Sequence, residues 1–291
     1  MLHRWVFVDG KMCRANNAPL SPWDRGILFG QGIFETLRSW SGVPFLVEEH
    51  EKRLLRSAQA LDLPAPTWKP YHSLRSLLHT LVRKNRLPEA YLRVMLTAGR
   101  SDSSAEHSAT VCILVRSLHP YDDKLYTHGA NVIISSIRRN LTCPLAAHKT
   151  LNYWSNLIAR RAATEQNAIE AFLLDTRGYL AEGSCTNLFF VQGGRLCTPS
   201  LKTNILPGIT RAHVMHLAGA ADIDIRQGLY HPESLLSAEE AFLTNALMGI
   251  LPIGRVNGRR IGRAAPGPVT KLLMKRYADS VHEHVRRFQS F

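Results

Sequence analysis

Short runs of apolar, β-branched and aromatic residues, several of them alternating with polar residues, characterise the first part of the chain. A period of two is typical of half-buried strands. Turn signals at Asp9-Gly10 and Ser41-Gly42 separate the runs. The chain is therefore expected to open with antiparallel strands over Trp5–Val8, Gly32–Arg38 and Val43–Val47.

In the next segments, the apolar residues recur with the period of a helix. Apolar residues recur on one face between about His50 and Leu61, and Pro64 follows as a helix terminator. A second helix is expected near Tyr71–Arg86. Two β-rich runs, Tyr91–Thr97 and Thr110–Val115, would then complete a mixed α+β unit.

The pattern changes again after the residues around Leu118–His128, which contain proline and several polar residues and are typical of a connection between domains. We expect an N-terminal domain over 1–118, a linker over 119–128 and a C-terminal domain over 129–291. Strands in the second domain are predicted at Asn131–Ser135, Ala171–Leu174, Thr186–Val191, Ile223–Arg226, Ala241–Leu243 and Ile250–Ile253, and helices near Asn152–Glu165, Ile209–Leu217 and Val269–Arg287. The fold class is α+β.

The net charge of +13 suggests an anionic partner, but the basic residues are scattered along the 291 residues. The densest cluster, Arg255 to Arg263, lies in a glycine-rich, hairpin-like stretch without interleaved aromatic residues. A solvated surface explains this cluster better than nucleic-acid binding does. No nucleic-acid partner is expected.

The five cysteines are odd in number and widely spaced, and none forms a CxxC pair or a metal-ligand cluster. We expect reduced thiols and no metal. The N-terminus lacks the apolar segment of a secretion signal, and no run of about 18 apolar residues occurs. These features predict a cytoplasmic protein with no membrane partner.

Three short segments carry candidate chemistry: Ala147–Tyr153 with Lys149, Leu180–Ser184 with Glu182, and Leu206–Arg211. Each alone has an ordinary explanation, as a surface lysine, a turn glutamate and a helix start. Together they supply an amine, an acid and a helix N-terminus, which are what an aldehyde cofactor with a phosphate group needs.

The same segments resemble those of the class-IV, fold-type-IV pyridoxal-phosphate enzymes: branched-chain aminotransferases, D-amino-acid aminotransferases and 4-amino-4-deoxychorismate lyases. The resemblance runs from Val8-Asp9-Gly10 almost to the end of the chain. Its motifs include Asp24-Arg25-Gly26, Phe29 to Thr36, His50 followed by Arg53, Glu182 to Phe189, and Leu206 to Arg211. The resemblance implies two domains, a smaller α/β N-terminal one and a larger β-rich C-terminal one, and a homodimer.

The resemblance also implies a role for individual residues toward pyridoxal 5'-phosphate. Lys149 matches the Schiff-base lysine, Glu182 the acid on the pyridine nitrogen, and Arg53 a phosphate ligand. Ile209 and Thr210 match phosphate-binding positions. The remaining cofactor positions are Tyr153, Thr244, Asn245 and Ala246, although many branched-chain enzymes have a Gly-Thr pair in place of Asn245-Ala246.

These roles imply a mechanism. Ionised Glu182 would keep the ring nitrogen protonated, so that the ring accepts electrons when a Cα bond breaks. Lys149 would act as the base that moves the proton.

The choice of reaction stays open between two members of the family. The Tyr91-Leu92-Arg93 segment and Phe34 match a branched-chain aminotransferase pocket, whereas the spacing from Lys149 to Tyr153 is similar to that of D-amino-acid aminotransferases and lyases. The segment Thr244–Gly249 and Phe34–Arg38 resemble the lyases most closely. An aminotransferase acting on an amino acid and a 2-oxo acid ranks first, and the lyase second.

A non-catalytic relative that only binds cofactor or nucleic acid is a third interpretation, which the presence of both Lys149 and Glu182 argues against. Arg38, Arg93 and Arg100 are candidate carboxylate ligands, with outward-facing strand arginines as the alternative. The full set of candidate substrate residues is Phe29, Phe34, Arg38, Tyr91, Arg93 and Arg100.

Overall fold

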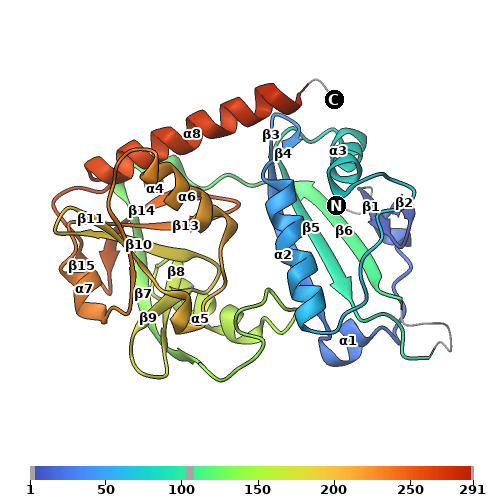
Figure 1. Ribbon diagram of the computed structural model, residues 1–291, viewed down its shortest axis with the longest axis horizontal. Coiled ribbons are helices and arrows are strands. Elements are labelled where there is room, and N and C mark those ends of the chain that lie inside the picture. The colour runs from blue at the N-terminus through green and yellow to red at the C-terminus, as the bar shows by residue number, and fades with distance from the viewer. Residues whose placement is uncertain (1–3, 103–107, 290–291) are drawn as a thin grey trace. The chain divides into compact units, whose positions relative to one another are not determined.

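The computed structural model describes residues 4–102 and 108–289 of the chain (Figure 1). It forms two compact units. The first unit contains 1–119, 148–152 and 281–291, and the second contains 120–147 and 153–280. Both units mix helices and strands, which confirms the α+β class. The expected domains, with a linker at 119–128, stay a prediction.

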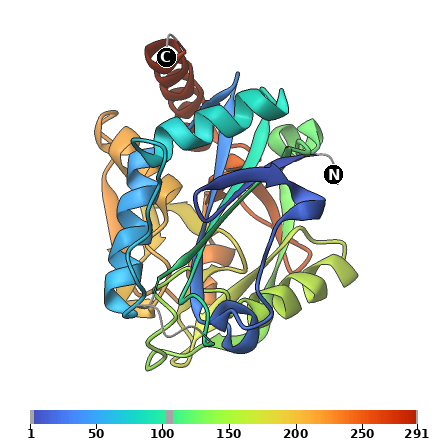
Figure 2. The ribbon, with the colours of Figure 1, turned by 90° about the vertical axis from the view of Figure 1, so that its right-hand side faces the viewer.

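A six-stranded antiparallel sheet forms the first unit, in the order β2-β1-β6-β5-β3-β4. One of its faces packs on α2 and α3 through a core that includes Ile33, Leu54 and Leu78. Figure 2 views this unit from the side of β1 and β2, with α2 in blue and α3 in teal. The elements are β1 (Trp5–Val8), β2 (Lys11–Arg14), α1 (Arg25–Phe29), β3 (Gly32–Trp40), β4 (Val43–Pro44), α2 (Val47–Ala60), α3 (Leu74–Asn85), β5 (Ala90–Thr97) and β6 (Thr110–Ser117).

The sequence prediction for this unit is confirmed for most strands and wrong at one junction. The strand expected over Val43–Val47 ends at Pro44, and the helix expected from His50 begins at Val47. The reason is Leu46, whose φ of 53° is left-handed and turns the chain before the helix starts.

A nine-stranded mixed sheet forms the second unit. Eight strands follow the order β12-β11-β10-β13-β14-β7-β8-β9, and β15 pairs with β14. Its strands are β7 (Ala130–Arg139), β8 (Glu170–Asp175), β9 (Leu180–Gly183), β10 (Asn187–Gln192), β11 (Arg195–Pro199), β12 (Ile225–Gly228), β13 (Glu240–Asn245), β14 (Gly249–Val256) and β15 (Arg259–Arg260). Its helices are α4 (Asp123–His128), α5 (Trp154–Glu165), α6 (Ile209–Gly219), α7 (Pro232–Leu236) and α8 (Pro268–Phe288), which continues into the first unit from Val281.

Part of the segment interpreted as a connection between domains forms a helix. Asp123–His128 forms α4, and the side chain of Asp122 accepts a hydrogen bond from the N–H of Lys124 at its start. Asp at an N-cap satisfies a backbone donor that the helix leaves open. The hairpin expected around Arg255–Arg260 is confirmed by the pairing of β14 with β15.

Within 4–102 and 108–289, no helix is both long enough and apolar enough to cross a membrane. The five cysteines are free thiols.

Candidate active site

Lys149 lies in a short segment that runs along the start of β3 in the first unit. The carbonyl of Lys149 accepts a hydrogen bond from the N–H of Phe34 (2.8 Å), and the N–H of Leu151 donates to Gly32 (2.9 Å). Thr150 forms a β-bridge with Ile33. This backbone pairing fixes the position of Lys149, whose Nζ lies 4.7 Å from the centre of the Phe34 ring.

One of the other candidate substrate residues, Arg93, lies near the same ring. The guanidinium of Arg93 on β5 lies 3.9 Å from the centre of Phe34, which is buried. The Nε of Arg93 is buried, and it has no hydrogen-bond partner among the described residues. Tyr91, two residues earlier on β5, lies against the guanidinium of Arg116 (4.2 Å).

The other two candidate arginines have carboxylate partners in the chain itself. Arg38 pairs with Glu89 at 2.8 Å and also lies over the ring of Trp40. Arg100 pairs with Asp102 at 2.8 Å. Of the three candidates, Arg93 is therefore the one whose buried donor lacks a partner in the described structure.

Arg53 is held by a buried acid that the sequence analysis missed. Its Nε and Nη2 donate to the two oxygens of Glu35 at 2.7 and 2.6 Å, and His50 Nδ1 lies 2.7 Å from the same carboxylate. All three residues are buried between β3 and α2. The strand pattern offered a signal, because Glu35 lies two residues from each of the core residues Ile33 and Leu37 and so shares their face of β3.

The charges of this cluster depend on its burial. Burial raises the pKa of Glu35, but Arg53 and His50 outweigh it and lower the pKa to about 2. Burial lowers the pKa of His50, so the imidazole is neutral at pH 7. The cluster is an Arg53–Glu35 ion pair beside a neutral histidine.

Phe29, the last residue of α1, has 66% of its surface exposed. Its neighbours Ile27 and Leu28 are also exposed, as is Trp23 just before the helix. A contiguous set of large apolar residues on one short helix is unusual for a solvent-exposed surface.

Glu182 lies on β9 in the second unit and is buried. Arg139 pairs with one carboxylate oxygen at 2.7 Å. The other oxygen accepts from the N–H of Leu206 (3.1 Å) and from the side chain of Asn187 (3.4 Å). The cation and the N–H donors favour the ionised carboxylate, which is the form that can hold a proton on a pyridine nitrogen.

The start of α6 lies in the same unit and is a helix N-terminus without a side-chain cap among the described residues. Gly208 is the N-cap, and no side chain caps this end of the helix in the described structure. The first N–H groups of a helix and its dipole suit a phosphate, and Ile209 and Thr210 occupy these positions. The buried hydroxyl of Thr244 has no hydrogen-bond partner among the described residues, which fits a ligand contact.

Asn245, which follows Thr244, uses its side chain within the protein. Its Oδ1 accepts from the N–H groups of Leu247 and Met248, both at 2.9 Å, and its Nδ2 donates to the carbonyl of Cys185 (3.3 Å). These bonds fix the turn that contains Ala246. Contacts from this turn to a ligand would come from its backbone.

Tyr153 is the N-cap residue of α5, and its hydroxyl donates to the carbonyl of Ser184 (2.9 Å). Burial raises the pKa of this phenol, so the hydroxyl stays protonated. The loop that carries Ser184 is fixed by Glu170, a buried carboxylate that accepts from the N–H of Ser184 (2.9 Å) and the hydroxyl of Thr186 (2.9 Å). Glu170 is a second acid that the sequence analysis missed.

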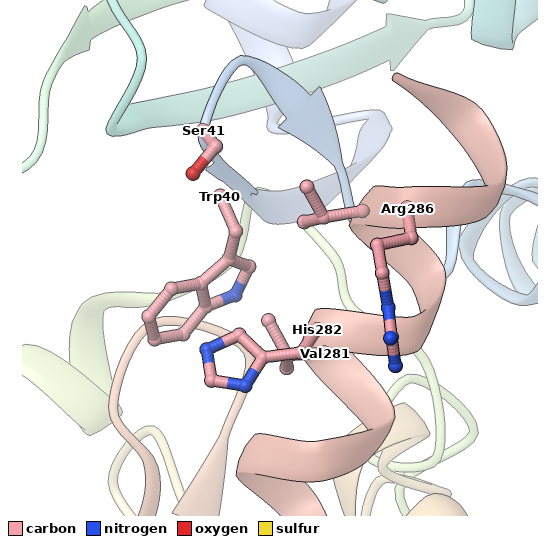
Figure 3. A pocket seen from close by; sticks show the side chains of 6 residues that line it. Trp40, Ser41, Val281, His282 and Arg286 are labelled. Atoms are coloured by element: carbon pink, nitrogen blue, oxygen red, sulfur yellow. The ribbon is translucent and has the colours of Figure 1, made fainter. Parts of the chain in front are cut away.

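Figure 3 shows an open pocket of about 460 Å³ in the first unit. Trp40 and Ser41 line it from the end of β3, and Val281, His282, Val285 and Arg286 line it from α8. None of the predicted site residues belongs to this lining.

The chain is similar to known proteins over most of its length. The sequence model of amino-transferase class IV matches residues 32–256. The chain belongs to the class-IV aminotransferases. It is 34% identical to a protein of Methanocaldococcus jannaschii that is provisionally named a branched-chain-amino-acid aminotransferase, over 94% of this chain and 95% of that protein. The aminodeoxychorismate lyase of Bacillus subtilis is 32% identical over 96% of both chains.

A solved structure has the same fold. The T.th. branched-chain amino acid aminotransferase with pyridoxamine 5'-phosphate matches with a TM-score of 0.87 and 26% identity, over 99% of this chain and 97% of that one. The protein is thus an enzyme of the class-IV family, and the family uses pyridoxal phosphate. The donor set present here fits that group, because an amine, an ionised acid and an uncapped helix start are all available. No cluster of metal-binding side chains occurs in the described residues.

Proposed function

We propose that this enzyme is an aminotransferase that moves an amino group between a branched-chain or D-amino acid and a 2-oxo acid, with pyridoxal 5'-phosphate attached to Lys149. One observation carries the proposal: the Phe34 ring lies against both the Lys149 amine and the Arg93 guanidinium, at 4.7 and 3.9 Å. An amino acid needs a carboxylate ligand and an apolar wall beside the reactive amine, and this arrangement offers both.

Each residue has a role in the reaction. When bound, the cofactor supplies an acceptor for the electrons of a broken Cα bond. Glu182 holds the proton on its ring nitrogen, and the start of α6 with Thr210 and Thr244 binds the phosphate. Arg53 is a further phosphate ligand, with its guanidinium plane set by Glu35. Lys149 moves the proton at the substrate Cα.

The substrate contacts follow from the buried donor of Arg93. A carboxylate that accepts from this Nε would satisfy a group that has no partner among the described residues. Tyr91 and Phe34 would line the side-chain pocket. Arg38 and Arg100 are weaker candidates because each pairs with an acid of the chain.

The second candidate function is aminodeoxychorismate lyase, which releases pyruvate and 4-aminobenzoate. The similarity to the Bacillus subtilis lyase over 96% of the chain supports it. Both reactions would use Lys149 and Glu182, so these residues do not discriminate between them.

Supplying one substrate at a time to the cofactor-loaded enzyme tests the proposal. With a single amino acid and no acceptor, an aminotransferase stops after one equivalent of 2-oxo acid, and the near-visible absorbance of the cofactor is lost. We expect this result with at least one amino acid in a panel of L- and D-isomers. Absorbance and product assays measure it, and Lys149→Ala is the inactive control.

A lyase behaves differently in the same experiment. It turns over aminodeoxychorismate repeatedly without an acceptor and keeps its absorbance. Sustained release of pyruvate and 4-aminobenzoate, with no reaction across the amino-acid panel, would overturn the first choice and establish the second.

A further inference from the structure

Arg139, the last residue of β7, makes an ion pair that the second unit buries. Its Nη2 lies 2.7 Å from Glu182, and the side chains of Arg139 and Glu182 are only 13% and 7% exposed. Exposed ion pairs contribute little to the stability of a protein. Removing one partner of a buried pair, however, leaves an uncompensated charge in the interior. The sequence offered no signal for this contact, because 43 positions separate the two residues.

The same guanidinium also binds two backbone carbonyls. Its Nε donates to Asn204 (3.0 Å), and Nη2 donates to Ala146. Ala146 precedes Lys149 by three residues, and Asn204 precedes the start of α6 by five. Arg139 therefore contacts the proposed acid and the chain segments that lead to the proposed lysine and the proposed phosphate site.

Asn204 extends this connection. It has a left-handed φ of 57°, and its side-chain amide donates to the carbonyls of Asn140 (3.0 Å) and Cys143 (3.1 Å). The side chains of Arg139 and Asn204 thus join the segment after β7 to the segment before α6. Segments without regular structure need such bonds to hold one conformation.

Glu182 has its second oxygen fixed by the same region. Oε2 accepts from the N–H of Leu206, two residues after Asn204. Each oxygen of the carboxylate is therefore held by a group from this network, Arg139 on one side and Leu206 on the other. A carboxylate with both oxygens held in this way keeps one orientation.

We propose that Arg139 is a positioning residue for the reaction: it keeps Glu182 ionised and oriented, and it ties the segments that lead to Lys149 and to the phosphate site to that acid. The inference rests on the proposed function. Arg139 acts through Glu182 and is assigned no contact with the substrate or the reacting atoms. A purely structural arginine would instead hold the segment 140–146 without regard to the charge of residue 182.

A double-mutant cycle separates these two roles. Arg139→Met, Glu182→Gln and the double variant are loaded with pyridoxal phosphate, and the rate of single-substrate conversion is measured. We expect Arg139→Met to slow the wild-type rate by about ten- to a hundredfold, but to change the Glu182→Gln rate less than about threefold. Equal losses in both backgrounds would show that Arg139 does not act through Glu182.

The pH profile gives an independent readout. Without the cation, Glu182 protonates more easily, so the acid limb of the rate profile of Arg139→Met should move to higher pH. Arg139→Lys keeps the charge but cannot reach three acceptors at once. It should restore the acid limb while binding cofactor more weakly than wild type. An acid limb in Arg139→Lys that moves to higher pH than in wild type would overturn the proposal, and this comparison of Arg139→Lys with wild type stands if the Met variant is insoluble.

Arg138→Met is the matched control, because Arg138 adjoins Arg139 on β7 and donates to the carbonyl of Ser135 (3.0 Å). It should leave the rate, the pH profile and the affinity of the apoprotein for the cofactor within about twofold. Borohydride reduction of wild type, followed by mass spectrometry, checks the proposed function separately. If the adduct is on Lys149 but the effects of Arg139→Met and Glu182→Gln are additive, only the role of Arg139 is rejected. If no adduct forms on Lys149, the proposed function is rejected.

Discussion

Buried charges at single residues are the clearest link between this sequence and its chemistry. Glu35, Glu170 and Glu182 are all buried, and each has hydrogen-bond donors on its oxygens. A buried carboxylate without such partners would be strongly destabilising. The three acids therefore fix their surroundings: Glu35 sets the plane of Arg53, Glu170 holds the loop at Ser184, and Glu182 joins Arg139 to Leu206.

Glu35→Gln tests the first of these acids. Removing the charge leaves Arg53 as a buried cation with a weaker partner, so the free energy of unfolding at pH 7 should fall by about 3–5 kcal/mol. Urea denaturation of the apoprotein measures this loss. Glu48→Gln is the control, because Glu48 pairs with Arg75 at the surface and its loss should cost less than about 1 kcal/mol.

The same comparison has a pH dependence of known sign. Glu35 has an ordinary pKa of 4.5 and a folded pKa of about 2. The contribution of Glu35 to the free energy of unfolding is complete above pH 4.5 and is lost as the pH falls through 2. The reason is that Glu35 binds a proton at a higher pH in the unfolded chain than in the folded protein. The difference in the free energy of unfolding between wild type and Glu35→Gln should therefore be smaller at pH 3 than at pH 7 by roughly 2 kcal/mol. A constant gap would show that Glu35 has an ordinary pKa.

At the scale of elements, the start of α6 explains why Gly208 occupies its position. Its φ of −65° is open to any residue, so backbone freedom is not the reason. A Cβ on Gly208 would lie 1.9 Å from Oδ1 of Asn187, whose amide donates to Glu182 and to the carbonyl of Leu206. The close packing of Asn187 on the helix start is the constraint, and it connects the proposed phosphate site to the acid.

Gly208→Ala should therefore displace Asn187 and disturb both sites. We expect about tenfold weaker cofactor binding and a loss of roughly 1–3 kcal/mol in the free energy of unfolding, from hydrogen bonds broken in a buried place. Fluorescence titration of the apoprotein and urea denaturation check the two values. Gly219→Ala at the other end of α6 meets no atom within 4 Å and should be neutral or slightly stabilising. Equal behaviour of the two variants would contradict this account.

At the scale of the whole molecule, each of the two compact units carries its own set of proposed residues. Lys149, Arg53, Phe34 and Arg93 belong to the first unit, and Glu182, Tyr153, Thr210 and Thr244 belong to the second. A further surface feature concerns association. The exposed apolar residues around α1 include Ile27 at 61% and Trp23 at 55%. We propose a second copy of this chain as the partner that covers them, because the resemblance of the sequence implies a homodimer.

We expect the enzyme to sediment at twice its 32.6 kDa chain mass and Ile27→Glu to shift it toward the monomer at micromolar concentration, because a buried charge weakens an apolar interface. Analytical ultracentrifugation measures the change. Leu55→Glu places the same charge on an exposed apolar position of α2 and should leave the dimer intact. A monomeric wild type, or equal effects of both substitutions, would reject this interface.

The sequence alone determined the α+β class, most strands and helices, and the family. These depend on local periodicity and on motifs such as Glu182–Phe189, which the linear order of residues contains. Only the tertiary structure decided which charged groups meet. The pairs Arg53–Glu35 and Arg139–Glu182 join residues on different elements, and Lys149 lies beside β3 of the first unit because the backbone of its segment pairs with Gly32 and Phe34. Such contacts depend on how strands and helices pack, and no spacing along the chain encodes them.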